Sequence, residues 1–337
     1  LGEPMNVVVE NEAHLDFLKD WANTVKGTST KLWAQINHPG RQAMEIINAE
    51  IKGPSAVPRY NKSRTKATTK IPTALTEKEI LEIIEAFGRT SAVLQKAGFS
   101  GVQIHGAHGY LVSQFLSPLA NIRTDKWGGS IINRARFVLE VYKSIRDKVG
   151  SDFCIGIKMN SADFQHGGFT EEESMVLIKM LSDAGIDLIE ISGGTYEAPV
   201  MMGKGKKSTK DREAYFMDFI EKARKVTTTP LMLTGGFRTP HLMNKALASN
   251  QVDVIGLARP FGLYPHLAEN IFAGRKKAFK IDFPKSGIRF IDNTMNIIWF
   301  EAQIKRMGKG KKPDFKLNPI GVFLRYALIL LKKKLFG

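Results

Sequence analysis

Two histidines and a tyrosine lie close together in the segment GFSGVQIHGAHGYLVSQFLSP, which covers residues 98–118. His105 and His108 are three residues apart, and Tyr110 follows two residues later. Imidazole N–H groups can bind a carbonyl oxygen or an oxyanion, and a phenol can transfer a proton. The histidines could also bind a metal, but no third ligand with matching spacing is evident, which argues against that role. Taken alone, the pair fits a structural role at a helix start as well as catalysis.

A second group of polar residues stands at the ends of apolar runs. Gln35 and Asn37 end one run, and Lys158 and Asn160 end another. In α/β barrels the functional residues gather at the carboxyl ends of the parallel strands. We therefore expect these side chains to lie near His105 and its neighbours.

Two glycine-containing turns follow the last two apolar runs. The first is TGGFRTP (residues 234–240), and the second is IGLARPF (residues 255–261), which contains Arg259. Backbone N–H groups at helix starts bind phosphate, and barrels often do so after their seventh and eighth strands. One Gly-Gly pair could simply make a turn, but two such turns with an arginine predict a phosphate site.

The expected elements alternate between strands and helices. Strand-length runs, continuously apolar as in parallel strands covered on both faces, span residues 31–37, 101–105, 153–160, 187–194, 230–236 and 252–259. A helix with Leu15, Leu18 and Val25 precedes them, and capping-box spacing opens later helices at Thr76 and Thr170. Pro240 stands where a first-turn proline belongs. This order predicts a parallel α/β sheet or barrel in one domain.

Composition limits the class of protein. The chain has 337 residues, of which 43% are hydrophobic and 24% charged, so a disordered or fibrous chain is excluded. Its single cysteine excludes an intrachain disulfide framework and a cysteine-bound iron–sulfur cluster, and it favours a reducing, cytoplasmic location.

The positive charge is concentrated at the end of the chain. Residues 305–337 contain ten Lys or Arg and one acid, a net charge of +9 out of +16. We therefore expect a basic appendage and no nucleic-acid-binding body. A solvated tail is the simpler interpretation. Weak contact with an acidic membrane surface is the alternative, because Lys332, Lys333 and Lys334 follow an apolar stretch too short to span a bilayer.

Seven segments occur in the order found in one enzyme family. They are QINHPGRQ, GFSGVQIHGAHGYLVSQFLSP, NIRTDKWGGSIINRARF, GIKMNSADF, SGGTYE, TGGFRT and DVIGLARP. They resemble the Old Yellow Enzyme family, the FMN-dependent, NAD(P)H-using ene-reductases described as NADH:flavin oxidoreductases. The resemblance runs from about Leu1 to Arg259, and HGAHGYLVSQFLSP and RTDKWGGS are its most specific blocks.

The resemblance implies a TIM (β/α)8 barrel that binds FMN non-covalently and takes hydride from NADH or NADPH. Gln35 would hydrogen-bond the pyrimidine edge of the flavin, and Lys158 would place positive charge near that edge. A lysine inside an apolar strand favours this role over a simple ion pair. The FMN phosphate would be held by the two glycine turns, through Gly235, Gly236, Gly256, Ala258 and Arg259.

The resemblance also implies how the histidines and the tyrosine would act. His105 and His108 would donate hydrogen bonds to the carbonyl oxygen of an α,β-unsaturated substrate, and Tyr110 would protonate its α-carbon. The expected reaction is hydride transfer through FMN to the C=C bond of this small molecule. Cys154 lies at the start of its strand, so we expect it to pack in the core. A structural role in ordering a loop is expected for Asn121, Arg123, Asp125 and Gly128.

Six strands are expected where a closed barrel needs eight. The opening LGEPMNVVVENEAHLDF resembles the segment after the family's second strand, so the first two strands and their flavin contacts are expected to be missing. We predict that residues 1–300 form an N-terminally truncated FMN-binding barrel domain and that residues 301–337 form a basic, partly apolar tail. The alternative to an enzyme is a non-catalytic barrel remnant, membrane-associated through this tail. Exposed strand edges would make such a chain poorly soluble and a weak FMN binder.

Overall fold

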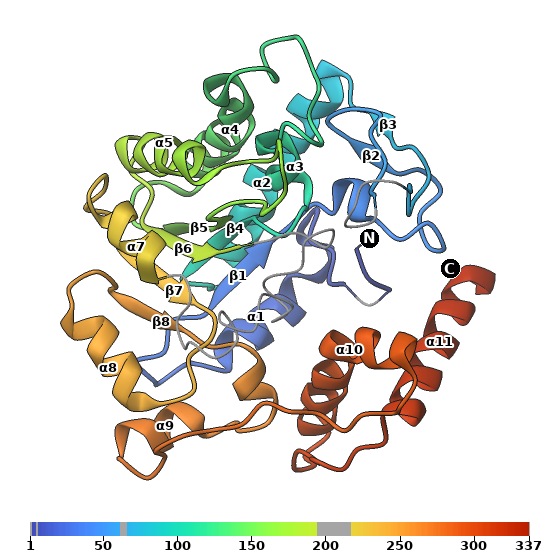
Figure 1. Ribbon diagram of the computed structural model, residues 1–337, viewed down its shortest axis with the longest axis vertical. Helices are drawn as coiled ribbons and strands as arrows, with labels where there is room; N and C mark the ends of the chain where they lie inside the picture. The colour runs from blue at the N-terminus through green and yellow to red at the C-terminus, as the bar shows by residue number, and fades with distance from the viewer. Residues whose placement is uncertain (1, 5, 61–65, 194–216, 337) are drawn as a thin grey trace. The chain divides into compact units, whose positions relative to one another are not determined.

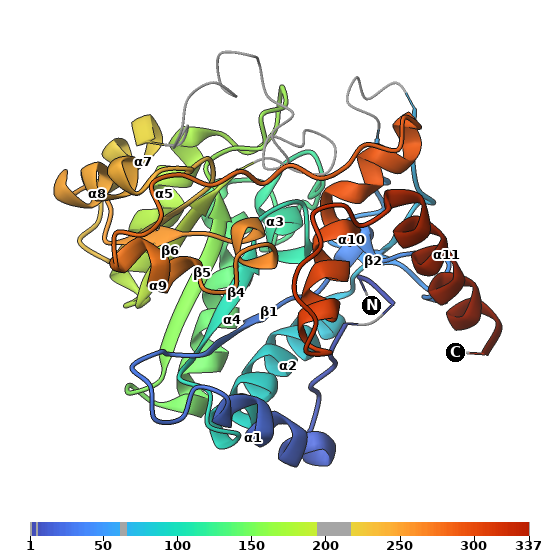
Figure 2. The ribbon, with the colours of Figure 1, turned by 90° about the horizontal axis from the view of Figure 1, so that it is seen from below.

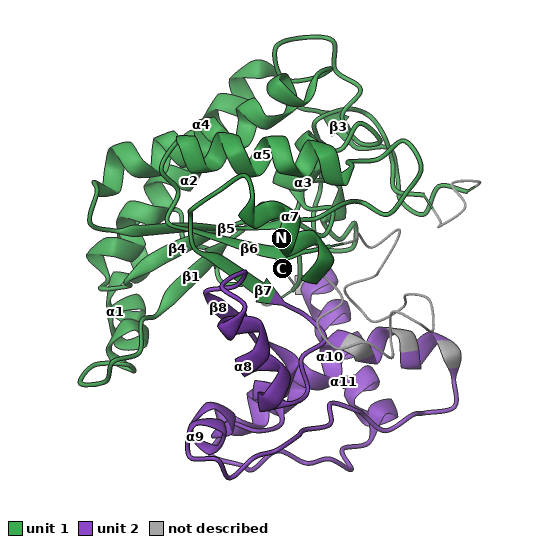
Figure 3. Ribbon diagram, turned by 60° about the vertical axis from the view of Figure 1, so that its left-hand side comes forward, with its two compact units in different colours: residues 1–205, 216–233 green, residues 206–215, 234–337 purple. Residues whose placement is uncertain are grey.

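A computed structural model describes residues 2–4, 6–60, 66–193 and 217–336 of the chain. The chain forms two compact units, coloured separately in Figure 3. Unit 1 comprises residues 1–205 and 216–233, and unit 2 comprises residues 206–215 and 234–337.

Five strands of unit 1 lie side by side in a parallel sheet (Figure 1). In sheet order they are β1 (Trp33–Ile36), β4 (Gly101–Gly106), β5 (Cys154–Asn160), β6 (Leu188–Ser192) and β7 (Leu231–Thr234). Every neighbouring pair in this series is parallel. Each strand forms at one of the predicted apolar runs, and the sixth run forms β8 (Val254–Gly256) in unit 2. The predicted α/β order of elements is therefore confirmed.

The described α-helices of unit 1 are α1 (Leu15–Asn23), α2 (Glu77–Lys96), α3 (Leu111–Leu116), α4 (Ile131–Val149), α5 (Glu171–Asp183) and α7 (Met217–Arg224). Two of these helices, α2 and α5, begin at the caps that the sequence predicts. Both predicted capping boxes form, at Thr76 before α2 and at Thr170 before α5, and each joins the cap reciprocally to a glutamate at the third helical position. Helix α1 ends at Asn23, so Val25 lies beyond it, contrary to the predicted periodicity.

The two faces of this sheet differ in chemistry. One face carries fully buried aliphatic side chains, such as Ile104, Ile157 and Ile189, and α2 packs against β1 and β4 (Figure 2). The alternate residues on the other face include Gln103 and Lys158, which are only half-buried. This face is therefore mixed in chemistry, although most residues on both faces of β4, β5 and β6 are buried, as the continuous apolar runs predict. Every second residue faces the barrel interior, where polar side chains replace aliphatic ones.

The chain forms a two-stranded parallel sheet, which the sequence did not predict, in the segment that connects β1 to α2. This sheet pairs β2 (Lys52–Gly53) with β3 (Thr73–Ala74). Arg123 holds this region from the RTDKWGGS block, because its Nη1 donates hydrogen bonds to the carbonyl oxygens of Pro54 (2.9 Å) and Leu75 (2.6 Å). A Cβ at Gly128 would lie only 2.2 Å from the Arg123 carbonyl oxygen, so no larger residue fits there. The predicted structural role of this block is confirmed.

Unit 2 contains β8 and most of the C-terminal helices. These are α8 (Pro240–Ala248), the 3-10 helix η4 (Arg259–Gly262), α9 (Leu267–Phe272), α10 (Arg289–Met307) and α11 (Pro319–Phe336). Pro240 occupies the first turn of α8, as predicted. The end of α10 and all of α11 lie in residues 301–337. A buried cluster around Trp299 and Met295 joins the two helices, and the Trp299 indole N–H donates a hydrogen bond to the Leu317 carbonyl oxygen. Among the described helices, none is long and apolar enough to cross a membrane.

Candidate active site

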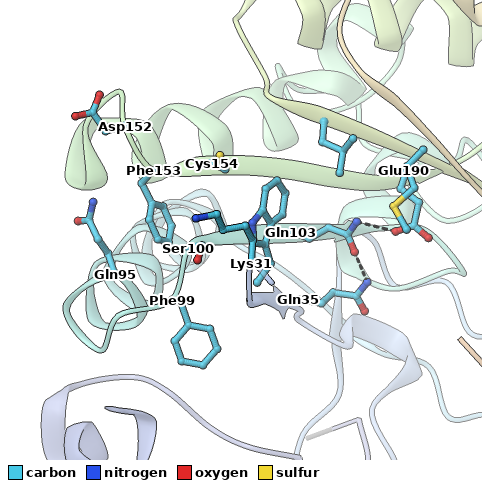
Figure 4. A pocket seen from close by; sticks show the side chains of 13 residues that line it. Lys31, Gln35, Gln95, Phe99, Ser100, Gln103, Asp152, Phe153, Cys154 and Glu190 are labelled. Carbon is cyan, nitrogen blue, oxygen red and sulfur yellow. Dashed lines mark hydrogen bonds between the residues drawn. The ribbon is translucent and has the colours of Figure 1, made fainter. Parts of the chain in front are cut away.

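A chain of polar side chains crosses the inner face of the sheet in unit 1. Strand register sets Gln35 opposite Gln103 and Lys158 opposite Glu190. The Gln35 side-chain amide donates to Gln103 Oε1 at 2.7 Å, and the Gln103 amide donates to Glu190 Oε2 at 2.7 Å, as the dashed lines in Figure 4 show. Lys158 Nζ lies 2.9 Å from Glu190 Oε1. The two predicted flavin-edge residues, Gln35 and Lys158, are thus linked through Gln103 and Glu190.

Glu190 changes the charge that Lys158 presents. Only 5% of the Glu190 side chain and 15% of the Lys158 side chain are exposed, so solvent screens this ion pair weakly. Its carboxylate offsets the positive charge that was predicted to act at the flavin edge. The ion pair considered for Lys158 is therefore present in the structure, with Glu190 as its partner. In the expected cofactor role, Lys158 would act together with this carboxylate.

An open hollow of about 780 Å³ lies on the same face and extends to the amino ends of the strands, where Phe99, Ser100 and Phe153 also line it (Figure 4). Its lining combines the polar residues Gln35, Gln103 and Glu190 with apolar ones that include Trp33 and Leu188. Cys154 also lines this hollow and is half-buried, so the prediction that it packs in the core is wrong. Burial and the nearby Asp187 raise the pKa of the Cys154 thiol, which therefore stays protonated at neutral pH.

Small residues make room for the Trp33 indole in this hollow. A Cβ at Gly101 would lie 2.7 Å from the Trp33 ring, and a Cβ at Gly156 would lie 2.9 Å from it. These glycines stand on β4 and β5, on the face that carries Gln103 and Lys158. The indole therefore occupies part of the inner face next to the polar chain.

The two histidines meet at the carboxyl end of β4. His105 is the fifth residue of the strand, and His108 follows in a turn with a φ of 62°. The Asn160 Oδ1 atom at the end of β5 accepts the backbone N–H of His108 at 3.2 Å, which stabilises this uncommon backbone conformation. The rings are nearly perpendicular, and His105 Nε2 lies 3.2 Å from His108 Nδ1.

Both histidines are neutral at neutral pH. Burial lowers the pKa of His105 well below its usual value, and electrostatic repulsion from His108 and then from Lys158 would further disfavour a proton on it. Burial first, and then Lys158, lowers the pKa of His108 to about 3. Each imidazole therefore carries one proton shared between two nitrogens, and its hydrogen bonds decide which nitrogen holds it.

Ser192 is the group that can set the tautomer of His108. Its Oγ lies 2.8 Å from His108 Nε2. When the hydroxyl donates to Nε2, the His108 proton is on Nδ1, which faces His105 Nε2. In the structure these two nitrogens are within hydrogen-bond distance of each other, so one of them donates and the other accepts. An oxygen that entered between the rings and replaced this contact could accept a hydrogen bond from each ring, the arrangement that stabilises negative charge on a carbonyl.

Tyr110 lies beside this pair. It is half-buried, directly precedes α3, and its ring centroid is 4.7 Å from that of His105. The structure therefore brings five predicted site residues into unit 1: Gln35, His105, His108, Tyr110 and Lys158.

The other five predicted site residues lie in unit 2. Gly235 and Gly236, between β7 and α8, have φ values of 127° and 84°, which favour glycine. Next to them, Thr234 Oγ1 is buried and has no hydrogen-bond partner within the described part of the chain. Gly256 ends β8, and Ala258 precedes η4, which Arg259 begins. The SGG motif after β6 is described only through Gly193, and Gly194 lies outside the described residues.

Sequence reasoning did not identify Gln103, Glu190 or Ser192. A signal for them was available, because each stands two residues from another polar residue on the same strand. Gln103 precedes His105, and Glu190 precedes Ser192, with this spacing. Alternate residues of a strand share a face, so period-two polar residues in an apolar run indicate an inner polar face.

Comparison with known proteins decides the family. Residues 2–278 match the model of the NADH:flavin oxidoreductase / NADH oxidase family. The chain belongs to this family. It is 39% identical over 273 residues to the NADH-dependent flavin oxidoreductase iccE of Talaromyces variabilis, covering 75% of this chain and 65% of that protein. It is 38% identical over 274 residues to nadA of Aspergillus parasiticus, a protein of the same description, covering 81% of this chain and 61% of that protein. The chain thus spans less than two thirds of the length of these relatives.

Solved structures agree with this assignment. An old yellow enzyme homologue from Zymomonas mobilis superposes with a TM-score of 0.68 at 25% identity, covering 82% of this chain and 77% of its own. A 2-naphthoyl-CoA reductase superposes with a TM-score of 0.72 at 29% identity, covering 81% of this chain and 43% of its own. The Old Yellow Enzyme structures are TIM barrels, and the parallel strands of this chain correspond to part of such a barrel. Members of the family use FMN with NAD(P)H.

Each unit contains residues that fit part of an FMN molecule. In unit 1, Gln35 is exposed at the hollow and offers an amide, and Lys158 offers an ammonium at the other end of the polar chain, beyond Gln103 and Glu190. In unit 2, the positive-φ glycines and the unpartnered Thr234 hydroxyl form a turn whose groups can meet phosphate oxygens.

Proposed function

We propose that this protein transfers a hydride from NAD(P)H, through FMN, to the C=C bond of an α,β-unsaturated carbonyl compound. Bound FMN would supply the hydride chemistry, and the residues of this chain would bind and polarise the substrate. The observation that carries the proposal is the pair of neutral histidines whose Nε2 and Nδ1 atoms lie 3.2 Å apart beside Tyr110.

The histidines would hold the carbonyl oxygen. With Ser192 donating to His108 Nε2, a carbonyl oxygen that replaced the contact between the two rings would accept from the Nδ1–H of His108 and the Nε2–H of His105. The charge that develops on this oxygen as hydride arrives at the β-carbon would be stabilised in a site where solvent screens little. Because both imidazoles are neutral, they would act as hydrogen-bond donors without releasing a proton.

Tyr110 would supply the proton that completes the reduction. A phenol loses its proton less readily than an imidazolium, so Tyr110 stays protonated until the α-carbon gains negative charge. Its ring packs against His105, which places the phenol next to the site of carbonyl binding. The remaining predicted residues would hold the cofactor: Gln35 and Lys158 its ring, and the turns at Gly235 and Gly256 its phosphate.

Product analysis tests this function. Purified protein supplied with FMN, NADPH or NADH, and 2-cyclohexen-1-one should form cyclohexanone with loss of one NAD(P)H per product molecule. His105→Ala combined with His108→Ala should lower kcat/KM by at least about 10²-fold, the loss typical of removing oxyanion donors. NAD(P)H oxidation that only reduces O2 to hydrogen peroxide or water, with the enone unchanged, would contradict the proposal and indicate an oxidase.

A further inference from the structure

Helix α11 (Pro319–Phe336) has one face that packs inside unit 2. Val322 is buried in the cluster with Trp299, and Phe323 and Tyr326 pack against the same cluster. These contacts fix which side of the helix faces α10. The opposite side is therefore the surface of the unit.

That opposite side carries a row of exposed aliphatic residues. Ile320, Leu324, Leu328, Leu331 and Leu335 are between 39% and 62% exposed. Their spacings of four, four, three and four residues keep them in a stripe about 80° wide on a helix that turns 100° per residue. A contiguous apolar ridge of this length on a surface helix is typical of a binding face.

Positive charges border this stripe on both sides. On the helical wheel, Arg325 and Lys332 lie beside one edge and Lys334 lies beside the other. Lys333 lies on the far side of the wheel and adds a fourth cation at the end of the helix, and α11 contains no Asp or Glu. The loop that leads into the helix adds Lys309, Lys311, Lys312 and Lys316. The ligand that fits this surface is therefore apolar along its middle and negatively charged along both edges.

We propose that α11 lies in the plane of an anionic lipid bilayer. The leucines would enter the boundary between headgroups and acyl chains, and the flanking cations would contact lipid phosphates and carboxylates. The helix would rest on the membrane without crossing it, in agreement with its insufficient apolar length. A second copy of this chain fits less well, because packing stripe against stripe would place cations beside cations with no acid on α11 to pair with them.

Sedimentation with lipid vesicles tests the proposal on the full 337-residue protein. Vesicles of phosphatidylcholine with 30% phosphatidylserine should bind the protein, and vesicles of phosphatidylcholine alone should bind it far less. Replacing Lys332, Lys333 and Lys334 together by Gln should lower partitioning into the anionic vesicles by about 10²-fold, because each lysine contributes roughly fivefold. The matched control replaces Lys78, Lys143 and Lys179, on helices of unit 1, which gives the same change in net charge and should leave binding unchanged.

A second variant tests the apolar stripe. Leu324→Asn with Leu328→Asn should weaken binding by about tenfold for each leucine, whereas Leu81→Asn with Leu247→Asn, at exposed leucines outside α11, should not. Circular dichroism and a thermal melt check that each variant folds, and the lysine variant keeps the test valid if the leucine variant does not. Absence of binding to anionic vesicles, or equal binding to neutral ones, would overturn the proposal. So would a dimer in lipid-free solution that the leucine change dissociates, because the stripe would then be an interface between copies.

Discussion

The neutral state of His108 predicts how the stability of the protein depends on pH. Its pKa falls from an ordinary 6.5 to about 3 in the folded chain. As the pH is lowered, the unfolded chain therefore takes up this proton first. The stability linked to neutral His108 is complete above about pH 7 and is lost progressively between about pH 6.5 and pH 3.

The size of this effect follows from the two pKa values. Between pH 7 and pH 5, proton uptake at this one position of the unfolded chain lowers the free energy of unfolding by about 2 kcal/mol. Burial lowers the pKa of His105 in the same direction, and it lowers that of His38 to about 4. All three histidines should therefore reduce the free energy of unfolding as the pH falls through this interval.

Replacing His108 by Asn isolates its contribution. Asparagine tolerates the left-handed backbone that His108 adopts, with a φ of 62°, better than most residues do. Urea unfolding followed by circular dichroism at pH 7 and pH 5 should show that the variant loses about 2 kcal/mol less than the wild type does. The exposed His14→Asn variant is the control and should retain the wild-type loss. An identical loss in the His108 variant would refute the argument that this histidine is buried in its neutral form.

Three further predictions concern the polar network. Glu190→Gln should lower the free energy of unfolding by about 3 kcal/mol in urea denaturation, because the Lys158 ammonium loses its counter-charge. The double variant with Lys158→Met should lose less than the sum of the two single-variant losses; a double-variant loss equal to that sum would show that the pair is not coupled. In FMN-loaded protein, Lys158→Met should lower the flavin reduction potential by a few tens of millivolts, and Glu190→Gln should raise it. Each kcal/mol of charge stabilisation corresponds to about 20 mV. Unchanged potentials with normal FMN content would place both groups away from the ring. Ser192→Ala should slow enone reduction about tenfold and leave flavin reduction by NAD(P)H unchanged, because no hydroxyl then keeps the His108 proton on Nδ1. Equal slowing of both steps would indicate a general structural defect.

Much of the fold could be predicted because local signals determine it. The Thr76 and Thr170 capping boxes and the first-turn Pro240 all form where their spacing places them. Those features depend on residues close in sequence, so periodicity and cap chemistry are sufficient to find them.

The polar chain across the sheet could not be predicted in the same way. Gln103 reaches Gln35 across 68 residues and Glu190 across 87 residues, and strand register alone brings them together. The sequence therefore predicted the positive charge of Lys158 at the site but not its ion pair with Glu190. Cys154 shows the same limit, because its exposure at the hollow depends on which face of β5 points inward.

The central claim is that Tyr110 delivers a proton to a substrate held by the two histidines. The most direct measurement follows reoxidation of the reduced, FMN-loaded protein by 2-cyclohexen-1-one in an anaerobic stopped-flow instrument, for wild type and Tyr110→Phe. We expect the variant to reoxidise at least about 10²-fold more slowly, while its flavin reduction by NAD(P)H stays near the wild-type rate. Equal reoxidation rates for the two proteins would contradict the claim and remove Tyr110 from the reaction.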